Sequence, residues 1–464
     1  MDMDFLGRLA LFLDSPTFPW KGMILGFGVT QYLFETFLSL RQHRKLQETT
    51  PPKALQGAVS QEDYDKSQAY GKAKSHYGFI SSFYGQATNV ATIYYNLLPK
   101  LWNLTGLWIT QYSPASFSGE ISKSLLFFIA FNISTTVINL PFSYYKTFVL
   151  EEKFGFNKQT RTLVSSHIFR MNFEPLKHRS YLHFFNQFFT DIIKNQVLIV
   201  VLGGPVLAGF LKIVQSFGTN FFYYLWVFVL FVQAFMITVY PLVILPMFNK
   251  LTPLEPGPLK TEVEALATRL QFPLKHLYVI DGSKRSAHSN AYFYGLPWSK
   301  HIVIYDTLIE KSEVSEVVAV LCHELGHWSE GHTTKLFAIA QFHMFYIFAL
   351  FSVFINNGSL YRAFGFYNSQ PILIGFLLFN DILQPLDTVV KLFMNILSRK
   401  FEYEADAFAV RLGYSSDLAK SLIKLQVQNL STMDADWLYS SYHFTHPILP
   451  ERLRALDWKG GKVE

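Results

Sequence analysis

Charged residues are scarce in this chain of 464 residues. Asp, Glu, Lys and Arg together make up 16% of it, whereas a soluble globular protein carries about 25%. Half of the residues are hydrophobic, and Phe, Tyr and Trp alone account for 17%. This composition excludes an ordinary soluble protein and indicates one that turns much of its apolar surface toward lipid.

Cysteine is almost absent, since Cys322 is the only one. A single cysteine excludes an intramolecular disulfide and metal sites built from thiolates. We expect Cys322 to be a small buried residue, because its side chain leaves a helix in a different direction from that of His323. A cleavable signal peptide is also missing: Asp2 and Asp4 make the start acidic, and no small-residue cleavage site follows a short apolar segment. The first apolar segment is therefore expected to be an uncleaved anchor.

Long apolar segments dominate the rest of the chain. About 20 apolar residues are enough for a helix to cross a lipid bilayer. Seven such segments predict transmembrane helices over residues 19–40, 79–101, 124–146, 194–214, 221–247, 336–356 and 371–396. The segments 79–101 and 371–396 carry several polar residues, so a helix buried in a protein core is an alternative for both. The sequence thus predicts a mainly α-helical, polytopic membrane protein.

Polar residues fall inside most of these segments. They are Gln31, Glu35, Gln86, Asn89, Asn132, Asn139, Gln341, His343, Asp381, Gln384 and Asp387. Such residues are costly at membrane depth unless they face water or the interior of a helix bundle. Hydrogen bonds between helices would account for a few of them. Their spread over most segments favours seven helices around a large hydrated chamber.

Lys and Arg are concentrated on one side of the predicted spans. Arg41, Arg44 and Lys45 follow the first span, and many basic residues fill the loop after the third, whereas residues 102–122 and 213–222 contain none. The positive-inside rule therefore predicts a lumenal or external N-terminus, with the loops after spans one, three and five and the C-terminal tail in the cytosol. Anionic lipid explains the basic charge, so we expect membrane lipid, and no nucleic acid, as a partner.

The spans divide the chain into regions. Within 248–334, the largest non-membrane stretch, a helix over 259–270 and strands over 277–280 and 301–305 predict a small α/β domain. The predicted regions are spans one to five in 1–247 with cytosolic loops 41–78 and 147–193, the α/β domain in 248–334, spans six and seven in 335–396, and a helical cytosolic tail in 397–464.

Residues 323–327 of the α/β domain read His-Glu-Leu-Gly-His, a His-Glu-x-x-His motif. Residues 315–321 before it are helix formers with apolar residues at helical spacing, so we expect the motif on a helix. Two imidazoles one helical turn apart reach a single tetrahedral metal ion, and Glu324 beside them can act as a base. The sequence therefore predicts a metalloprotease with one Zn²⁺ per chain, held by His323, His327 and a third protein ligand.

Two segments are candidates for the third ligand. His332 lies five residues after His327, but this spacing does not match the third histidine of the metzincins. Beyond the last span, Glu402 and Asp406 lie four residues apart on one face of a predicted helix. One of these carboxylates would bind the metal, and the other would accept a hydrogen bond from the ring N–H of a ligand histidine.

The His-Glu-x-x-His motif, the run Phe-Glu-Tyr-Glu-Ala-Asp at 401–406 and seven spans together resemble the type I CAAX prenyl proteases. These are integral-membrane zinc metalloproteases of the eukaryotic endoplasmic reticulum and inner nuclear membrane. Further matches are residues 151–157, 282–286 and 288–295, and His446-Pro447 followed by Arg452. The similarity extends over essentially the whole chain. The one visible departure is Glu404, where the family leads us to expect Gln; it is not expected to alter the chemistry.

The resemblance implies a role for each residue around the metal. His323, His327 and Glu402 would hold the zinc ion. Glu324 would be the general base that takes a proton from the attacking water and passes it to the leaving amine. Asp406 would orient a ligand histidine. The choice between the two carboxylates is thus made by the family pattern.

The resemblance also implies the residues that meet the substrate. Asn290, Ala291 and Tyr292 would hold the extended substrate backbone beside a strand, by edge addition. His446 and Arg452 would donate hydrogen bonds to the oxyanion or to the substrate carboxylate. Taken alone, His446 before a proline could simply cap a turn, and Arg452 could pair with nearby acidic residues.

The implied substrate is a protein whose C-terminal CAAX cysteine is already prenylated, and from which the last three residues are removed. Some members of the family make a second cut upstream in the same precursor. We expect the chain to act as a monomer in the endoplasmic reticulum membrane, with the inner nuclear membrane as a further location. Two alternatives remain: a membrane quality-control zinc protease of the same clan, and a seven-span receptor or transporter with a degenerate metal motif.

Overall fold

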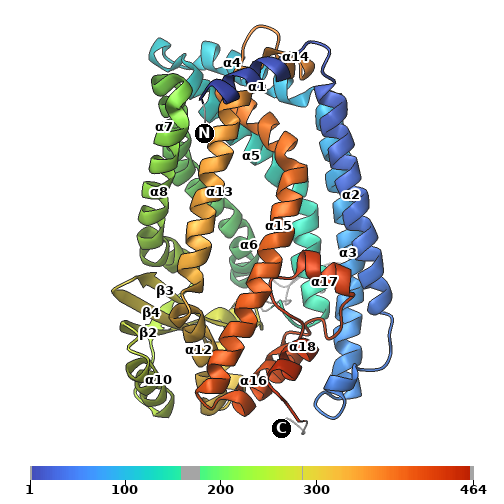
Figure 1. Ribbon diagram of the computed structural model, residues 1–464, viewed down its shortest axis with the longest axis vertical. Helices are drawn as coiled ribbons and strands as arrows, with labels where there is room; N and C mark the ends of the chain where they lie inside the picture. The colour runs from blue at the N-terminus through green and yellow to red at the C-terminus, as the bar shows by residue number, and fades with distance from the viewer. Residues whose placement is uncertain (1–2, 158–177, 285, 460–464) are drawn as a thin grey trace.

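The computed structural model describes residues 3–157, 178–284 and 286–459. Long helices run along its longest axis, and a small sheet with short helices lies at one end (Figure 1). The prediction of a mainly α-helical protein is therefore confirmed, and the described residues include a small sheet within the predicted α/β region. Part of the predicted loop 147–193, Arg285 and the last five residues lie outside the described residues.

The elements follow one another along the chain in three groups. The first group contains α1 (Met3–Leu13), α2 (Trp20–Lys45), α3 (Gln61–Tyr94), α4 (Leu97–Tyr112), α5 (Glu120–Tyr145), α6 (His178–Leu198), α7 (Gly204–Phe217), α8 (Phe221–Val239) and α9 (Leu245–Phe248). The second contains β1 (Leu251–Pro253), α10 (Pro258–Arg269), β2 (Leu274–Ile280), β3 (Ala291–Leu296), β4 (Ser299–Tyr305), α11 (Asp306–Lys311) and α12 (Val314–Ser329). The third contains α13 (His332–Phe354), α14 (Gly358–Ala363), α15 (Ile372–Arg411), α16 (Ser415–Gln428), α17 (Trp437–His443) and α18 (Leu449–Ala455).

Some of the helical stretches are both long enough and apolar enough to cross a membrane. Within the described ranges, five stretches are long and apolar enough to cross a membrane: Trp20–Lys45, Glu120–Glu151, Phe188–Phe248, His332–Phe354 and Ile372–Arg411. They cover six of the seven predicted spans, because the 61-residue stretch Phe188–Phe248 contains two of them. The predicted span 79–101 is not among these stretches.

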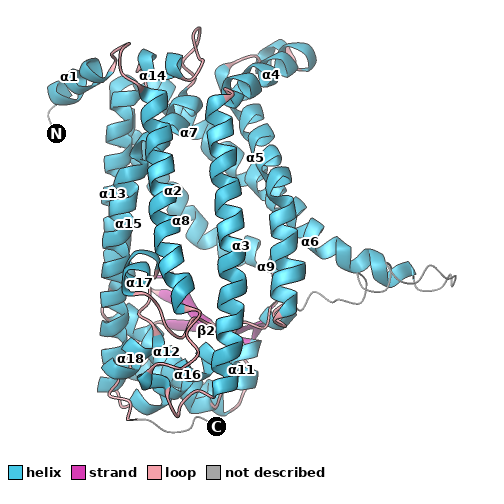
Figure 2. Cartoon of the chain, turned by 90° about the vertical axis from the view of Figure 1, so that its right-hand side faces the viewer, coloured by secondary structure: helices cyan, strands magenta, loops and turns pink. Residues whose placement is uncertain are grey.

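The helix α3 is long enough but too polar to be among these stretches, and its bounds also differ from the predicted ones. Ser60 caps α3 by accepting a hydrogen bond from the backbone N–H of Asp63 at 3.1 Å, so the helix begins at Gln61, inside the predicted loop 41–78. It ends at Tyr94, because Asn96 takes a left-handed conformation with φ of 51°. The chain then turns into α4 at the end of the molecule opposite the sheet (Figure 2). A single helix over 79–101 was therefore a wrong prediction.

The last apolar segment and the acidic run form one helix. α15 has 40 residues, from Ile372 to Arg411, which corresponds to a length of about 60 Å. This is about twice the thickness of the hydrocarbon layer of a bilayer. The predicted boundary between 396 and 397 falls inside this helix. The apolar segment that could cross a membrane and the acidic run with Glu402 and Asp406 are therefore one continuous helix.

The α/β domain contains a four-stranded sheet in the order β1-β2-β4-β3. β2 and β4 are parallel, and the other two pairs are antiparallel. The predicted strands correspond to parts of β2 and β4, and the predicted helix over 259–270 to α10. Buried apolar residues of α10, α12, β4, α15 and α16 form one core. β3 lies at the edge of the sheet, with its residues 291–296 paired to β4 alone.

The polar residues inside the apolar segments have mixed partners. Gln341 of α13 donates from Nε2 to Oε1 of Gln233 on α8 at 2.6 Å, which is a hydrogen bond between helices. Asn132 donates instead to the carbonyl of Phe128 in its own helix at 2.9 Å. Interhelical bonds thus account for some of these residues, and the hydrated chamber stays a prediction.

A close approach between α12 and α15 generates the first prediction. A Cβ atom at Gly326 would lie 3.2 Å from Cβ of Phe408 and 3.3 Å from Cα of Ala405. Gly326→Val should therefore push the two helices apart and lower the free energy of unfolding by about 1–3 kcal/mol. Gly85→Val on α3 is the control, because a Cβ there meets no atom within 4 Å. Thermal unfolding of the full chain in detergent measures both, and equal melting temperatures would contradict the close contact.

Candidate active site

The helix α12 holds the His-Glu-x-x-His motif in place from both ends. A capping box fixes its start, in which the side chain of Glu316 accepts from the backbone N–H of Glu313 at 2.9 Å. Gly331, with φ of 68°, separates it from α13. Cys322 is fully buried, and burial raises the pKa of its thiol to about 12. This cysteine is the small core residue that the sequence predicts.

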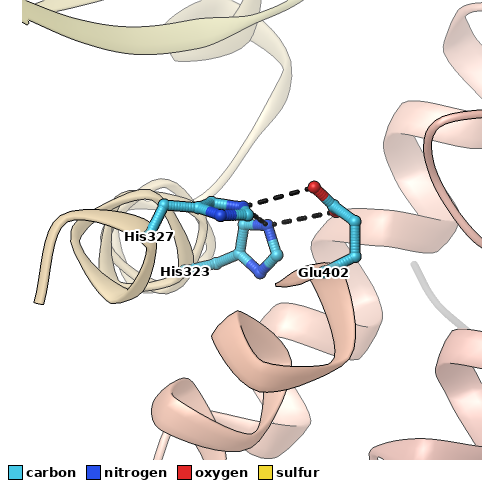
Figure 3. Close-up of side chains that lie close together, drawn as sticks. All are labelled: His323, His327 and Glu402. Carbon is cyan, nitrogen blue, oxygen red and sulfur yellow. Dashed lines mark hydrogen bonds and ion pairs between the residues drawn. The ribbon is translucent and has the colours of Figure 1, made fainter. Parts of the chain in front are cut away.

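Three side chains from α12 and α15 point to one spot (Figure 3). Nε2 of His323 lies 3.3 Å from Nε2 of His327 and 3.4 Å from Oε2 of Glu402, and Nε2 of His327 lies 3.2 Å from Oε1 of Glu402. Ligand atoms of a tetrahedral zinc ion, at about 2.0–2.2 Å from it, stand about 3.4 Å apart. Oε2 of Glu402 is also buried without a hydrogen-bond partner in the described chain. The residues present therefore fit a single zinc ion, and the predicted ligands are brought together.

Glu324 lies on the same helix and is half-buried. Burial raises the pKa of Glu324 above the ordinary range of a glutamate, although the charges of His323 and His327 oppose this. A carboxylate with a raised pKa accepts a proton from water more readily. Its position and its electrostatics thus suit the general base that the motif predicts.

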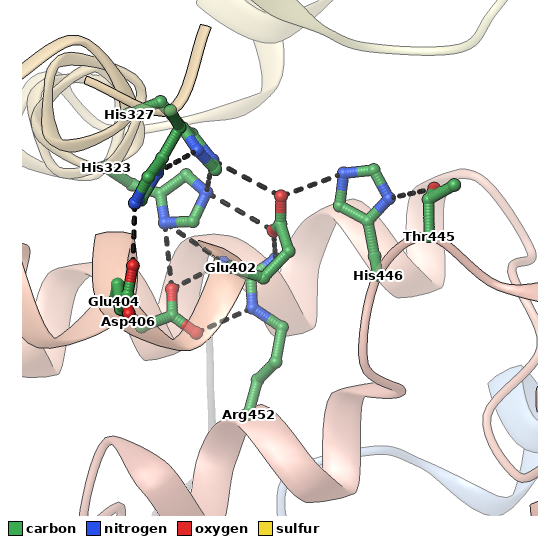
Figure 4. Close-up of polar contacts among 9 residues, drawn as sticks. His323, His327, Glu402, Glu404, Asp406, Thr445, His446 and Arg452 are labelled. Atoms are coloured by element: carbon green, nitrogen blue, oxygen red, sulfur yellow. Dashed lines mark hydrogen bonds and ion pairs between the residues drawn. The ribbon is translucent and has the colours of Figure 1, made fainter. Parts of the chain in front are cut away.

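Asp406 and Arg452 support the ring of His323 (Figure 4). Nδ1 of His323 lies 2.9 Å from Oδ1 of Asp406, so its N–H donates to this carboxylate and Nε2 keeps a lone pair toward the metal position. Arg452 donates from Nε to Oδ2 of Asp406 at 2.9 Å, and a second bond comes from its Nη2. Asp406 and Arg452 are 1% and 8% exposed. Asp406 therefore lies against the ring of His323, and the guanidinium of Arg452 is turned toward Asp406, so donation from Arg452 to a substrate stays a prediction.

His446 approaches the same group from a more open side. Its Nε2 lies 3.2 Å from Oε1 of Glu402, and its Nδ1 lies 2.9 Å from Oγ1 of Thr445. The side chain is 65% exposed. The segment that leads to it is tied to the end of α2, because Arg41 binds both carboxylate oxygens of Asp436 at 2.9 and 2.8 Å. His446 is thus held beside the metal group and open to an incoming molecule.

The predicted substrate-binding residues lie at the start of the edge strand β3. The side-chain oxygen of Asn290 accepts a hydrogen bond from the backbone N–H of Ala291 at 2.8 Å. The backbone carbonyl of Asn290 accepts one from the backbone N–H of Tyr305 at 3.0 Å. Asn290 is exposed, Ala291 is buried and Tyr292 is half-buried. These hydrogen bonds stay within the sheet and do not reach the metal group, so the role of the three residues in binding stays a prediction.

Two residues of the site were not assigned a role by the sequence. Nδ1 of His332 lies 3.0 Å from Nδ1 of His327, and its Nε2 lies 2.8 Å from Oε2 of Glu404. His332 is therefore a neighbour of a ligand, in agreement with its rejection as a ligand on spacing. The five-residue separation in the sequence is a weak signal for this contact, because it depends on the turn at Gly331 between α12 and α13.

Comparison with known proteins covers nearly the whole chain. Residues 253–459 match peptidase family M48, and residues 42–173 and 178–250 match the CAAX prenyl protease N-terminal domain with five membrane helices. CAAX prenyl protease 1 of Saccharomyces cerevisiae is 43% identical over 98% of this chain and 99% of its own length. The human homolog is 39% identical over 94% of both chains. The crystal structure of S. mikatae Ste24p superposes with a TM-score of 0.86 at 42% identity, over 95% of this chain and 100% of that one.

The buried pair of Arg452 and Asp406 generates the second prediction. Arg452→Met should lower the free energy of unfolding by about 3–5 kcal/mol, because it leaves the Asp406 carboxylate buried without its cation. Arg454→Met on the same helix is the matched control, since Arg454 is exposed and contacts only the carbonyl of Pro450 among the described residues. Denaturant unfolding of both variants in detergent checks this, and equal losses would contradict it.

Proposed function

This chain belongs to the CAAX prenyl protease family of M48 metallopeptidases, and on that basis we propose that it removes the last three residues of proteins whose CAAX cysteine is already prenylated. The observation that carries the proposal is the convergence of His323, His327 and Glu402 beside Glu324, on helices that join the α/β domain to the apolar segments. Neither a receptor nor a broad quality-control protease finds support, because the full-length relatives are named CAAX prenyl protease 1.

The residues of the site divide the reaction among them. A zinc ion held by His323, His327 and Glu402 would polarise the scissile carbonyl and make water more acidic. Glu324 takes the proton of the attacking water and passes it to the leaving amine. His446 lies on the open side beside Glu402 and donates to the developing oxyanion. The three metal-binding side chains already face one spot.

Arg452 has a different part in this proposal. Its guanidinium binds both oxygens of Asp406 and lies 3.6 Å from Oε2 of Glu402. It therefore acts first on the charge and orientation of the metal-binding side chains. Donation from Arg452 to the substrate carboxylate would require it to leave Asp406, which is why we assign the oxyanion to His446.

The substrate backbone is proposed to bind along β3. Only one edge of this strand is paired within the described sheet, so its other edge offers main-chain donors and acceptors to an extended peptide. Asn290, Ala291 and Tyr292 lie where such a peptide would begin. Edge addition would hold the main chain of the last residues without demanding particular side chains.

The membrane setting explains why this peptidase selects prenylated proteins. A single lipid chain gives reversible membrane binding, so it delivers a peptide to a multi-pass protein without trapping it. We propose seven spans around a hydrated chamber: the five apolar stretches contain six of them, and α3 is about 50 Å long, enough to cross. The chain would act as a monomer in the endoplasmic reticulum membrane and the inner nuclear membrane. In some precursors it would make a second cleavage upstream of the first.

The proposed orientation puts the N-terminus in the lumen and the zinc site and C-terminus in the cytosol. The basic end of α2 supports it, because Arg41 and Lys45 contact Asp436 and Asp434 of the C-terminal region at 2.8 and 3.2 Å. The residues that the positive-inside rule assigns to the cytosol therefore lie on the same side as the site.

The general base gives the third prediction. Glu324→Gln should lower the rate of tripeptide release by about 10²- to 10⁴-fold, because it removes proton transfer and keeps the shape of the side chain. Glu330→Gln at the end of the same helix is the control, since Glu330 makes only an exposed ion pair with Arg411 among the described contacts. Mass spectrometry of the released tripeptide measures both variants, and full activity of Glu324→Gln would end the protease proposal.

The prenyl group gives the fourth prediction. The full chain in lipid should cleave a farnesylated CAAX peptide about tenfold or more faster than its unprenylated twin, because the lipid concentrates the peptide at the membrane. The same pair of peptides in detergent solution separates membrane delivery from direct recognition of the lipid. Equal rates under both conditions would exclude a prenyl-specific substrate and leave the protease activity standing.

A further inference from the structure

Both metal-binding histidines use their second ring nitrogen, but with different partners. Nδ1 of His323 meets a carboxylate directly, that of Asp406 at 2.9 Å. Nδ1 of His327 meets another imidazole, that of His332 at 3.0 Å. The next group after the ring of His332 is a carboxylate: Oε2 of Glu404 lies 2.8 Å from Nε2 of His332. Figure 4 shows the two carboxylates, Asp406 and Glu404, on the same helix α15.

Hydrogen-bond chemistry fixes the protons along the longer chain. Nε2 of His332 faces a carboxylate, which only accepts, so Nε2 must carry the proton. The neutral ring then has a lone pair at Nδ1, and the short contact requires the proton to lie on Nδ1 of His327. His327 is therefore held in the tautomer whose Nε2 is unprotonated and turned toward Glu402. This is the tautomer that a metal ligand needs.

The surroundings hold His332 in this position. Its ring is 1% exposed and stacks on Phe401, with centroids 4.1 Å apart and an angle of 11° between the planes. It is the first residue of α13, directly after the turn at Gly331. Three helices thus contribute one member each, since His327 comes from α12 and Glu404 from α15.

We propose that His332 and Glu404 are positioning residues that fix the ring of His327 for zinc binding. The inference rests on the proposed zinc site and extends it to residues that do not touch the metal. Glu404 is more open than Asp406, with its side chain 36% exposed against 1%. Its hydrogen bond competes with water, so removing the Glu404 carboxylate weakens metal binding less than removing the imidazole of His332.

The experiment measures zinc affinity of the full chain in detergent by competition with a chromophoric chelator. His332→Phe keeps a ring that stacks on Phe401 and removes both nitrogens; zinc affinity should fall about 10- to 100-fold. Glu404→Leu should cost about tenfold or less. Glu404→Gln should restore the affinity, because the amide oxygen accepts the same hydrogen bond. Lys400→Met is the matched control, since Lys400 lies 3.6 Å from Glu404 without touching His332 in the described contacts.

A double variant separates positioning from a general structural role. If the two residues act in one chain, His332→Phe with Glu404→Leu binds zinc no more weakly than His332→Phe alone. Independent, additive losses would overturn the proposal, as would wild-type affinity in His332→Phe. Thermal unfolding of the metal-free variants confirms folding, and half-exposed Glu404 supplies the test if His332→Phe does not fold. Absence of zinc binding in the wild-type chain would instead refute the proposed function itself.

Discussion

The contact between α12 and α15 is the constraint on which the site depends. His323 and His327 come from one helix and Glu402 from the other, 75 residues further along the chain, and Gly326 lets the two backbones approach closely. A larger side chain at that position would separate the three ligands before it affected any of them directly. The smallest residue of the His-Glu-x-x-His motif is therefore as necessary to its geometry as the histidines, and helix packing sets the distances between the ligand atoms.

Charge balance explains why this contact suits a divalent cation better than a neutral core. The carboxylates of Glu402 and Asp406 lie beside the guanidinium of Arg452, and Glu324, next to His323 on α12, adds a third negative charge to the region. With neutral histidines the group carries two negative charges in excess, which is costly in a buried place. A divalent ion would cancel this excess, and Oε2 of Glu402, which accepts no hydrogen bond within the described residues, is the atom it would satisfy. Binding of such an ion would couple to the folding of this region, which gives the proposed positioning residues beyond the ligands their importance.

Local sequence patterns predicted the parts of the site that lie within a helix. The motif on α12 and the four-residue spacing of Glu402 and Asp406 follow from helical periodicity, and both are found where expected. The predicted bounds 79–101 were wrong because hydropathy does not register the left-handed Asn96 that ends the helix, and α15 continues where polarity suggested a boundary. The partners of Arg452 and His332 depend on contacts between helices. Helical periodicity does not predict such contacts. The resemblance to a family implied donation from Arg452 to the substrate, whereas the described contact is with Asp406, and it gave no role for His332.

The outer edge of β3, which has no partner strand among the described residues, connects the proposed chemistry to the choice of substrate. An open strand edge invites association with other chains and is usually protected, so one beside a candidate peptidase site is costly unless a substrate covers it. Main-chain pairing along such an edge holds an extended peptide but reads little of its sequence. In the proposed reaction the last residues of the substrate vary, so this indifference is useful. Selection must then come from elsewhere, and a lipid anchor that restricts peptides to the membrane supplies it. If the site binds only the substrate backbone, the selection of substrates depends on their attachment to the membrane. This accounts for a peptidase in which α15, the helix that carries Glu402, is apolar enough to cross the bilayer.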